Sequence, residues 1–215
     1  MMLYTSVELP PSQADICTET PMLLVGSCFS DEIGGLLQNN QLNVLANPFG
    51  VLFNPLSIFS LLEKAILEQN IDNQLFVKRK ELWLHLGLHS DFSELDKDVL
   101  TTKIQTKLSE VHHFLTQNQP TIYLFITFGT AWVYRHHATG QLVANCHKLP
   151  AQEFTKELLS VSTIVENYQK LAEILPENIK TVLTVSPVRH TKDTLPLNSV
   201  SKAVLRLACS AHCDV

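Results

Sequence analysis

Extended basic stretches are missing from this sequence of 215 residues. It carries 16 lysines and arginines against 21 aspartates and glutamates, a formal net charge of −5, and its longest basic cluster is Lys78-Arg79-Lys80. Binding to a nucleic-acid backbone relies on many clustered cations that displace counterions. The composition therefore argues against a nucleic-acid partner and favours a small or neutral substrate.

Long hydrophobic runs are missing as well. No apolar stretch approaches the ~20 residues that a membrane-spanning helix needs. The first six residues also lack the basic segment, followed by a long apolar one, that marks a secretory signal. We therefore expect a soluble, cytoplasmic protein without a membrane partner.

The cysteines indicate no disulfide framework, because their number is odd and their spacing irregular. They are Cys17, Cys28, Cys146, Cys209 and Cys213. This usage suits a reducing compartment, in which most cysteines are small buried residues.

Cofactor motifs are also absent. Neither the phosphate-loop pattern Gly-x-x-x-x-Gly-Lys nor the dinucleotide pattern Gly-x-Gly-x-x-Gly occurs, and no Cys-x-x-Cys pair is present to begin a zinc site. A metal site assembled from distant residues would use Cys28, Cys146, His147 and His190, an alternative that the spacing disfavours. We expect no metal and no cofactor.

The sequence does contain enough apolar material for one sizeable core. Hydrophobic residues make up 45% of the chain, and the mean hydropathy is +0.09. A chain of this length buries enough surface for one domain. Since no internal repeat or linker interrupts it, we expect residues 1–215 to form a single domain.

Residues 21–34 are the most informative stretch. Four apolar residues after Pro21 predict a short buried strand that stops at Gly26, and the apolar spacing from Phe29 onward predicts a helix. Ser27 and Cys28 lie at the junction. In open α/β sheets the carboxyl end of a strand opens a crevice beside a helix N-terminus, where an oxygen or sulfur anion would be stabilised.

Two later strands end in a similar way. Residues 121–128 form a continuous apolar run closed by Gly129-Thr130, and residues 181–185 lead into Ser186-Pro187-Val188-Arg189-His190. Right-handed crossovers would bring the ends of all three strands to one edge of a parallel sheet. The three strand ends therefore mark the expected site.

Two other segments are expected beside this edge. Residues 132–134 and 141–144 predict a hairpin around Thr139-Gly140 that delivers Asn145, Cys146 and His147 at its end. Residues 83–93 alternate and end in polar groups, which indicates an insertion beside the site.

Capping signals predict where helices begin. Asn54 and Pro55 predict the start of a helix that carries apolar residues to Ile66, and the apolar spacing of residues 96–117 predicts one long helix. A capping box at Thr163-x-x-Glu166 and a cap at Asn198 predict two more.

The sequence resembles the GSCFA family, whose Gly-Ser-Cys-Phe-Ala motif appears here as Gly26-Ser27-Cys28-Phe29-Ser30. The resemblance covers about residues 20 to 208. It extends through residues 47–55, 128–134, 145–150 and 186–190. The family looks like a relative of the SGNH/GDSL hydrolases, which cleave or transfer acyl groups, often on carbohydrates. This implies a flavodoxin-like, three-layer α/β/α fold with a parallel sheet.

The resemblance also implies roles for individual residues. The superfamily's first motif places Cys28 at the position of the nucleophile, and a shift of one residue would place Ser27 there instead. Gly50, in the turn that begins at Asn47, is the nearest match to a glycine that donates to an oxyanion. Gly129-Thr130 hold the place of a later motif without its asparagine, for which Asn145 would substitute.

The end of the chain departs from the superfamily pattern. No Asp-x-x-His, which supplies the base in the superfamily, occurs before Val215, so the final strand and helix are expected to be missing. His190 is the preferred base within this chain and His147 the alternative, while Arg189 would bind a carboxylate or oxyanion. The alternative interpretation is that the chain is a fragment or is shortened, and that its site is damaged.

Two hypotheses follow for function. The first is an acyl-ester hydrolase or acyltransferase that acts on an acylated carbohydrate or small ester, with Cys28 or Ser27 as nucleophile. The second is an inactive remnant or ligand-binding domain in which the crevice persists without its base.

Overall fold

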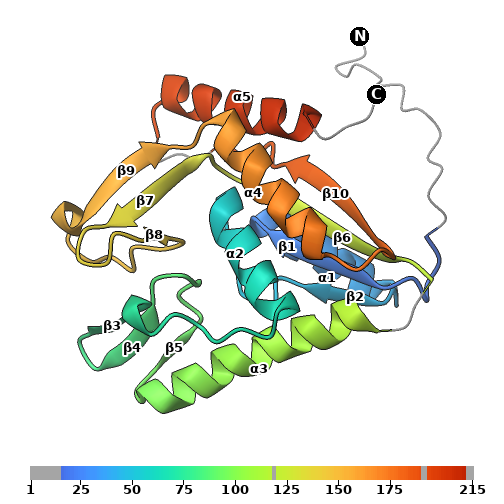
Figure 1. Ribbon diagram of the computed structural model, residues 1–215, viewed down its shortest axis with the longest axis horizontal. Helices are drawn as coiled ribbons and strands as arrows, with labels where there is room; N and C mark the ends of the chain where they lie inside the picture. The colour runs from blue at the N-terminus through green and yellow to red at the C-terminus, as the bar shows by residue number, and fades with distance from the viewer. Residues whose placement is uncertain (1–15, 118–119, 190–192, 212–215) are drawn as a thin grey trace, which may run out of the picture.

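A four-stranded parallel sheet forms the centre of the protein, which is described here from a computed structural model covering residues 16–117, 120–189 and 193–211 (Figure 1). The strand order is β10-β6-β1-β2, with every neighbouring pair parallel. The strands are β1 (Met22–Gly26), β2 (Val44–Ala46), β6 (Ile122–Phe128) and β10 (Ile179–Val185). The three strands predicted from apolar runs are confirmed, and β2 is an additional edge strand.

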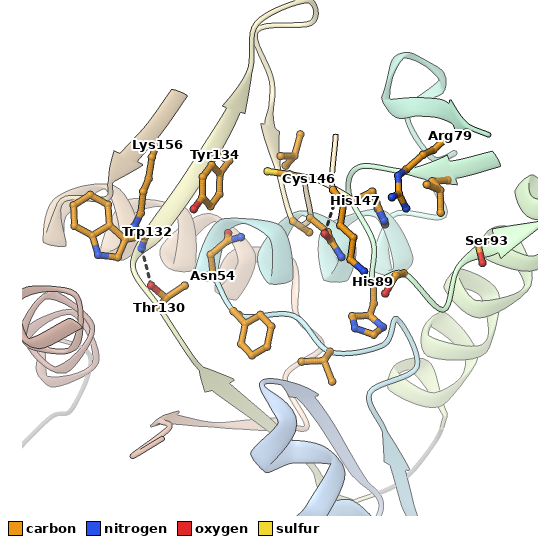
Figure 2. A pocket seen from close by; sticks show the side chains of 18 of the residues that line it. Asn54, Arg79, His89, Ser93, Thr130, Trp132, Tyr134, Cys146, His147 and Lys156 are labelled. Carbon is orange, nitrogen blue, oxygen red and sulfur yellow. Dashed lines mark hydrogen bonds between the residues drawn. The ribbon is translucent and has the colours of Figure 1, made fainter. Parts of the chain in front are cut away.

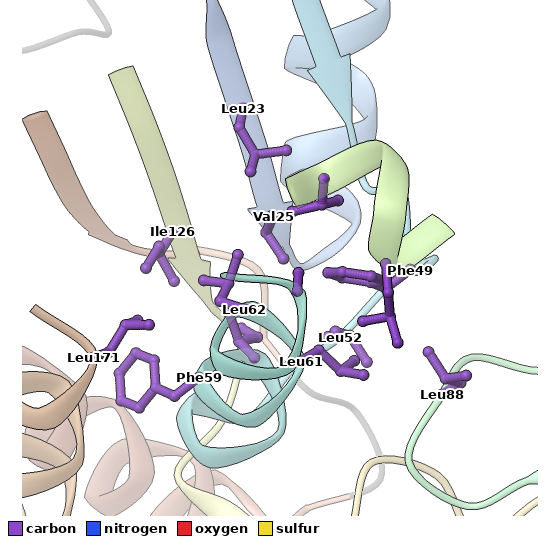
Figure 3. Close-up of a cluster of buried hydrophobic side chains, with 14 of the residues drawn as sticks. Leu23, Val25, Phe49, Leu52, Phe59, Leu61, Leu62, Leu88, Ile126 and Leu171 are labelled. Carbon is purple, nitrogen blue, oxygen red and sulfur yellow. The ribbon is translucent and has the colours of Figure 1, made fainter. Parts of the chain in front are cut away.

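Helices cover both faces of this sheet, which gives the predicted α/β/α arrangement of three layers. The helices are α1 (Cys28–Asn39), α2 (Pro55–Ile66), α3 (Lys97–Thr116), α4 (Val161–Ile174) and α5 (Leu195–Ser210). Alternate residues of β1 face opposite layers: Leu23 and Val25 join the main core, whereas Met22 and Leu24 belong to a second cluster with residues of α1. Figure 3 shows Leu62 of α2 in the main core. Strand β1 is therefore buried on both faces, as its continuous apolar run predicts.

One of the three predicted helix caps is confirmed and two are wrong, while the cap of α3 was not predicted. The Asn54 side chain accepts a hydrogen bond from the N–H of Ser57 at 2.9 Å, and Asp96 caps α3. The predicted capping box is wrong, because α4 begins earlier with Ser160 accepting from the N–H of Thr163. The cap at Asn198 is also wrong, because α5 begins one turn earlier, at Leu195.

Two small antiparallel sheets stand beyond the carboxyl edge of the central sheet (Figure 1). One contains β3 (Phe76–Arg79), β4 (Leu82–His85) and β5 (Ser93–Glu94), with a 3-10 turn at Asn73–Leu75 before it. The other contains β7 (Trp132–His136), β8 (Leu142–Val143) and β9 (Phe154–Leu158), with a 3-10 turn at Ala151–Glu153 before β9. The β7–β8 hairpin was predicted, but β9 was not.

The two small sheets are joined by a satellite core. It consists of Leu75, Leu86, Val143 and Phe154, all buried. Two backbone hydrogen bonds, from the N–H groups of Ala144 and Asn145 to the carbonyl of Leu86, reinforce the junction.

Among the described residues, no helix is both long enough and apolar enough to cross a membrane.

Candidate active site

The turn after β1 depends on a glycine. Gly26 has φ of +143°, and a Cβ there would lie 2.1 Å from the carbonyl oxygen of Thr127 on β6. Only glycine permits this approach of β1 to β6. The N–H of Ser27 then donates to the same carbonyl at 3.0 Å. The turn therefore places Ser27 and Cys28 at the carboxyl edge of the sheet, as predicted.

The two nucleophile candidates lie in different environments. Cys28 is the first residue of α1 and is exposed as a free thiol. Ser27 is 1% exposed, and its Oγ has no hydrogen-bond partner among the described residues. Although Ser27 occupies the N-cap position, its side chain makes no capping bond. Of the two candidates, only Cys28 is an exposed residue.

A lysine that the sequence did not mark as a site residue lies at the same edge of the sheet as Cys28. The Lys202 ammonium, on α5, donates to the carbonyls of Gly129 and Ser186, both at 2.7 Å. These carbonyls follow β6 and β10, so Lys202 spans two strand ends. Burial lowers the pKa of Lys202, and the charge of a Cys28 thiolate opposes that shift. The edge therefore holds a fixed cation within electrostatic range of the thiol.

Asn47 connects the turn after β1 to helix α1 through side-chain hydrogen bonds. Its buried side chain accepts from the N–H of Gly26 at 2.8 Å and donates to Asp31 of α1 at 2.6 Å. Its carbonyl accepts the N–H of Gly50 at 2.8 Å. Asn47 thus positions the turn, and the N–H of Gly50 already has an acceptor.

Gly129 and Thr130 pack against the segment that precedes α2. Both of their N–H groups donate to the carbonyl of Phe53, at 2.8 and 3.0 Å. A Cβ on Gly129 would lie 2.7 Å from the Phe53 ring. By contrast, the N–H groups of Cys28 and Phe29, at the start of α1, have no acceptor in the described part of the chain.

The turn after β8 has an unusual backbone. His147 and Lys148 have φ of 48° and 57°, a region that non-glycine residues seldom adopt. The Asn145 side chain stabilises this turn by accepting the N–H of His147 at 2.9 Å. His147 is 5% exposed, and its Nε2 lies 2.9 Å from the carbonyl oxygen of His85, to which it donates. Its Nδ1 has no partner among the described residues.

His85 is held as a neutral imidazole. Its Nδ1 accepts the N–H of Gly87 at 3.1 Å, and its Nε2–H donates to the carbonyl of Asp72 at 3.0 Å. Burial lowers the pKa of His85 to about 4. Burial also lowers the pKa of His147. Both rings therefore carry no charge near pH 7.

A cavity of about 790 Å³ opens between the two small sheets (Figure 2). Tyr134 and Trp132 lie at one end, and Arg79, His89 and His147 lie at the other. Of the predicted binding residues, Thr130, Asn145 and His147 line the cavity. The inserted segment that the sequence placed beside the site contributes Leu84, His89 and Ser93.

Cys28 is not among the residues that line this cavity. Val51 and Phe53 line the cavity, while Leu52 between them donates its N–H to the carbonyl of Gly26 at 2.8 Å. One short segment therefore separates the cavity from the β1 turn. Arg189 is exposed and does not line the cavity, and His190 lies outside the described residues.

The described residues contain no group of three or more His, Cys, Asp or Glu side chains close enough to hold a metal ion. His85 and His89 have the spacing of a helical zinc pair, but His85 is the last residue of strand β4. Both ring nitrogens of His85 are also hydrogen-bonded to the backbone.

The fold and this edge define a three-layer α/β protein with an exposed cysteine at the carboxyl end of its first strand. The model of the GSCFA family matches residues 21–215, and the chain belongs to that family. Searches of curated proteins and of solved structures found no match.

Proposed function

We propose that the protein is an acyl-ester hydrolase or acyltransferase in which Cys28 is the nucleophile. The observation that carries this proposal is the exposed Cys28 thiol at the start of α1, within electrostatic range of the Lys202 ammonium. A cation and a helix N-terminus both stabilise a thiolate, which is the attacking form of cysteine. Ser27, with its buried Oγ, is the weaker candidate.

The proposed reaction has two halves. His190, the base expected from the sequence, takes the Cys28 proton, and the sulfur bonds to the acyl carbon. The carbonyl electron pair moves to oxygen, and the oxyanion is held by the N–H groups of Cys28 and Phe29. The ester C–O bond then breaks, and His190 returns the proton to the leaving alcohol. Water or an acceptor hydroxyl attacks the thioester and restores the thiol.

Lys202 has a supporting role in this scheme. Two of its N–H groups are engaged by the carbonyls of Gly129 and Ser186, so the ammonium stays in place while charge develops. A preorganised charge of this kind needs no rearrangement during the reaction. Lys202 would therefore stabilise the Cys28 thiolate and the early oxyanion.

Hydrolysis of short-chain p-nitrophenyl esters tests the proposal. Cys28→Ala should lower kcat/KM by about 100-fold or more, and Lys202→Met by roughly 10- to 100-fold. Ser27→Ala should retain activity, and Cys17→Ala serves as the control at another exposed cysteine. Mass spectrometry should detect an acyl group on wild-type Cys28. Equal rates for Cys28→Ala and wild type would refute the role of Cys28.

The alternative, a ligand-binding domain without turnover, is favoured by one observation. The cavity is lined by residues of the two small sheets and does not include Cys28. If this alternative holds, ligands will bind in the cavity while no acyl-enzyme forms and Cys28→Ala behaves like wild type.

A further inference from the structure

The cavity is positively charged although the protein as a whole is negative. Arg79, Lys80, Lys148 and Lys156 line it, and Asp193 is the only acidic side chain that the described residues contribute to the lining. That carboxylate forms an ion pair with Lys156. Among the described residues, Arg79, Lys80 and Lys148 take part in no ion pair. Three cations therefore remain to attract an anionic group.

Arg79 is the best placed of these cations. Figure 2 shows its guanidinium at the end of the cavity that also holds His147 and His89. A guanidinium offers a planar pair of N–H donors that matches a carboxylate or phosphate.

His147 lies at the same end as an uncharged ring. Because its Nε2–H donates to the carbonyl of His85, its Nδ1 carries the lone pair. That Nδ1 is buried in a residue only 5% exposed and has no partner among the described residues. Because this Nδ1 is buried, it does not reach the cavity, and the uncharged His147 ring forms part of the wall beside Arg79.

The opposite end offers an aromatic wall. Tyr134 and Trp132 are two residues apart on β7, so their side chains leave the same face of the strand. Tyr134 is 39% exposed, and Figure 2 shows it facing the cavity, near Asn54. Lys156 covers the Trp132 ring, with its Nζ 4.6 Å from the ring centroid. Tyr134 is thus the ring that is open to a ligand.

We propose that this cavity binds an anionic carbohydrate, with its carboxylate or phosphate on Arg79 and its ring against Tyr134. This inference rests on the proposed function in one respect, because the sugar would be the alcohol part of the ester. The acyl group would extend past residues 51–53 to Cys28. Binding itself does not depend on Cys28.

Calorimetric titration of the Cys28→Ala protein tests this site without turnover. The probes are glucuronate, glucose 6-phosphate, glucose and inorganic phosphate. Glucuronate or glucose 6-phosphate should bind at least tenfold more tightly than glucose, and the stronger of the two identifies the acid group. Tyr134→Ala should weaken the sugar acids but leave inorganic phosphate unchanged.

Arg79 variants provide the decisive comparison. Arg79→Met should weaken the anionic sugar at least tenfold, and Arg79→Lys should be intermediate because it retains the charge without the paired donors. Arg206→Met, at an exposed position on α5, is the matched control. Equal affinity for glucose and the acids, or equal effects of Arg79→Met and Arg206→Met, would overturn the inference. Arg79-dependent binding without any esterase activity would refute the proposed function alone.

Discussion

At the scale of single residues, the two side chains that follow β1 differ in burial, since Ser27 is 1% exposed whereas Cys28 is exposed. The apolar run followed by Gly26 was enough to place Ser27 and Cys28 at the end of β1, because a buried strand must stop where polar residues begin. The sequence could not show that Ser27 would be buried, since that depends on neighbouring strands. Lys202 gave no signal, because a lysine on an amphipathic helix is usually a solvated residue.

His85 provides a prediction about acid stability. Its pKa is about 4 in the folded protein and 6.5 in an ordinary environment, so between these values the unfolded state binds a proton that the folded state does not. The free energy of unfolding should therefore fall as the pH drops from 6.5 to about 4, by roughly 3 kcal/mol. Above pH 6.5 His85 should contribute no pH dependence.

Denaturant unfolding at pH 7 and pH 4.5 measures this effect. His85→Gln should be less stable than wild type at pH 7 but lose less stability on acidification. His113→Gln, at an exposed position of α3, should keep the wild-type pH dependence. If His85→Gln and wild type lose equal stability over this interval, His85 is not the group responsible.

Helices and strands were predictable from the sequence where capping residues or apolar patterns act locally. Helix α2 begins where Asn54 and Pro55 indicated, because both the cap and the fixed φ of proline act locally. Strand β9 was missed because its alternation is weak and its pairing partner, β7, is distant in sequence. Helix α4 was misplaced by one turn because Ser160 and Thr163 are both good caps, and only the fold selects between them.

Adjacent glycines in α1 give a prediction about how this helix packs. A Cβ on Gly34 would lie 2.4 Å from the Cβ of Ala46 on β2, whereas a Cβ on Gly35 would meet nothing within 4 Å. Gly34→Ala should therefore destabilise the protein by roughly 1–3 kcal/mol through overpacking. Gly35→Ala should stabilise it by about 0.5–1 kcal/mol, since alanine is the better helix former.

Thermal and denaturant unfolding of the two variants provide the measurement. The neighbouring site is the control, because both substitutions add the same methyl group to the same helix. Equal shifts in both variants would show that α1 does not approach β2 as closely as described.

The whole molecule combines a central sheet with two small sheets that enclose the cavity. Overall charge and composition predicted a small or neutral substrate, yet the cavity gathers four basic side chains. Net charge sums over the entire surface and cannot report a local excess. The cavity could not be predicted because residues 79–93 and 130–148 meet only through tertiary contacts.

Leu86 gives a prediction at this scale. It is fully buried in the satellite core, and its carbonyl accepts two hydrogen bonds from the segment after β8. Leu86→Ala should cost roughly 2–5 kcal/mol. Hydrogen exchange should become faster in β3, β4, β7 and β8, while β1 and β6 keep their protection.

Leu95→Ala is the control, because Leu95 is 70% exposed and its truncation should change stability by less than about 0.5 kcal/mol. Uniformly faster exchange throughout the Leu86→Ala protein would contradict a separate satellite core.

The separation of Cys28 from the cavity lining has an evolutionary consequence. Cys28 stands on the first crossover of the sheet, whereas the cavity is built from insertions after α2 and after β6. Substitutions in those insertions can change which molecule is captured without disturbing the turn at Gly26. We therefore expect homologues that share the motif to diverge in ligand preference through these two segments.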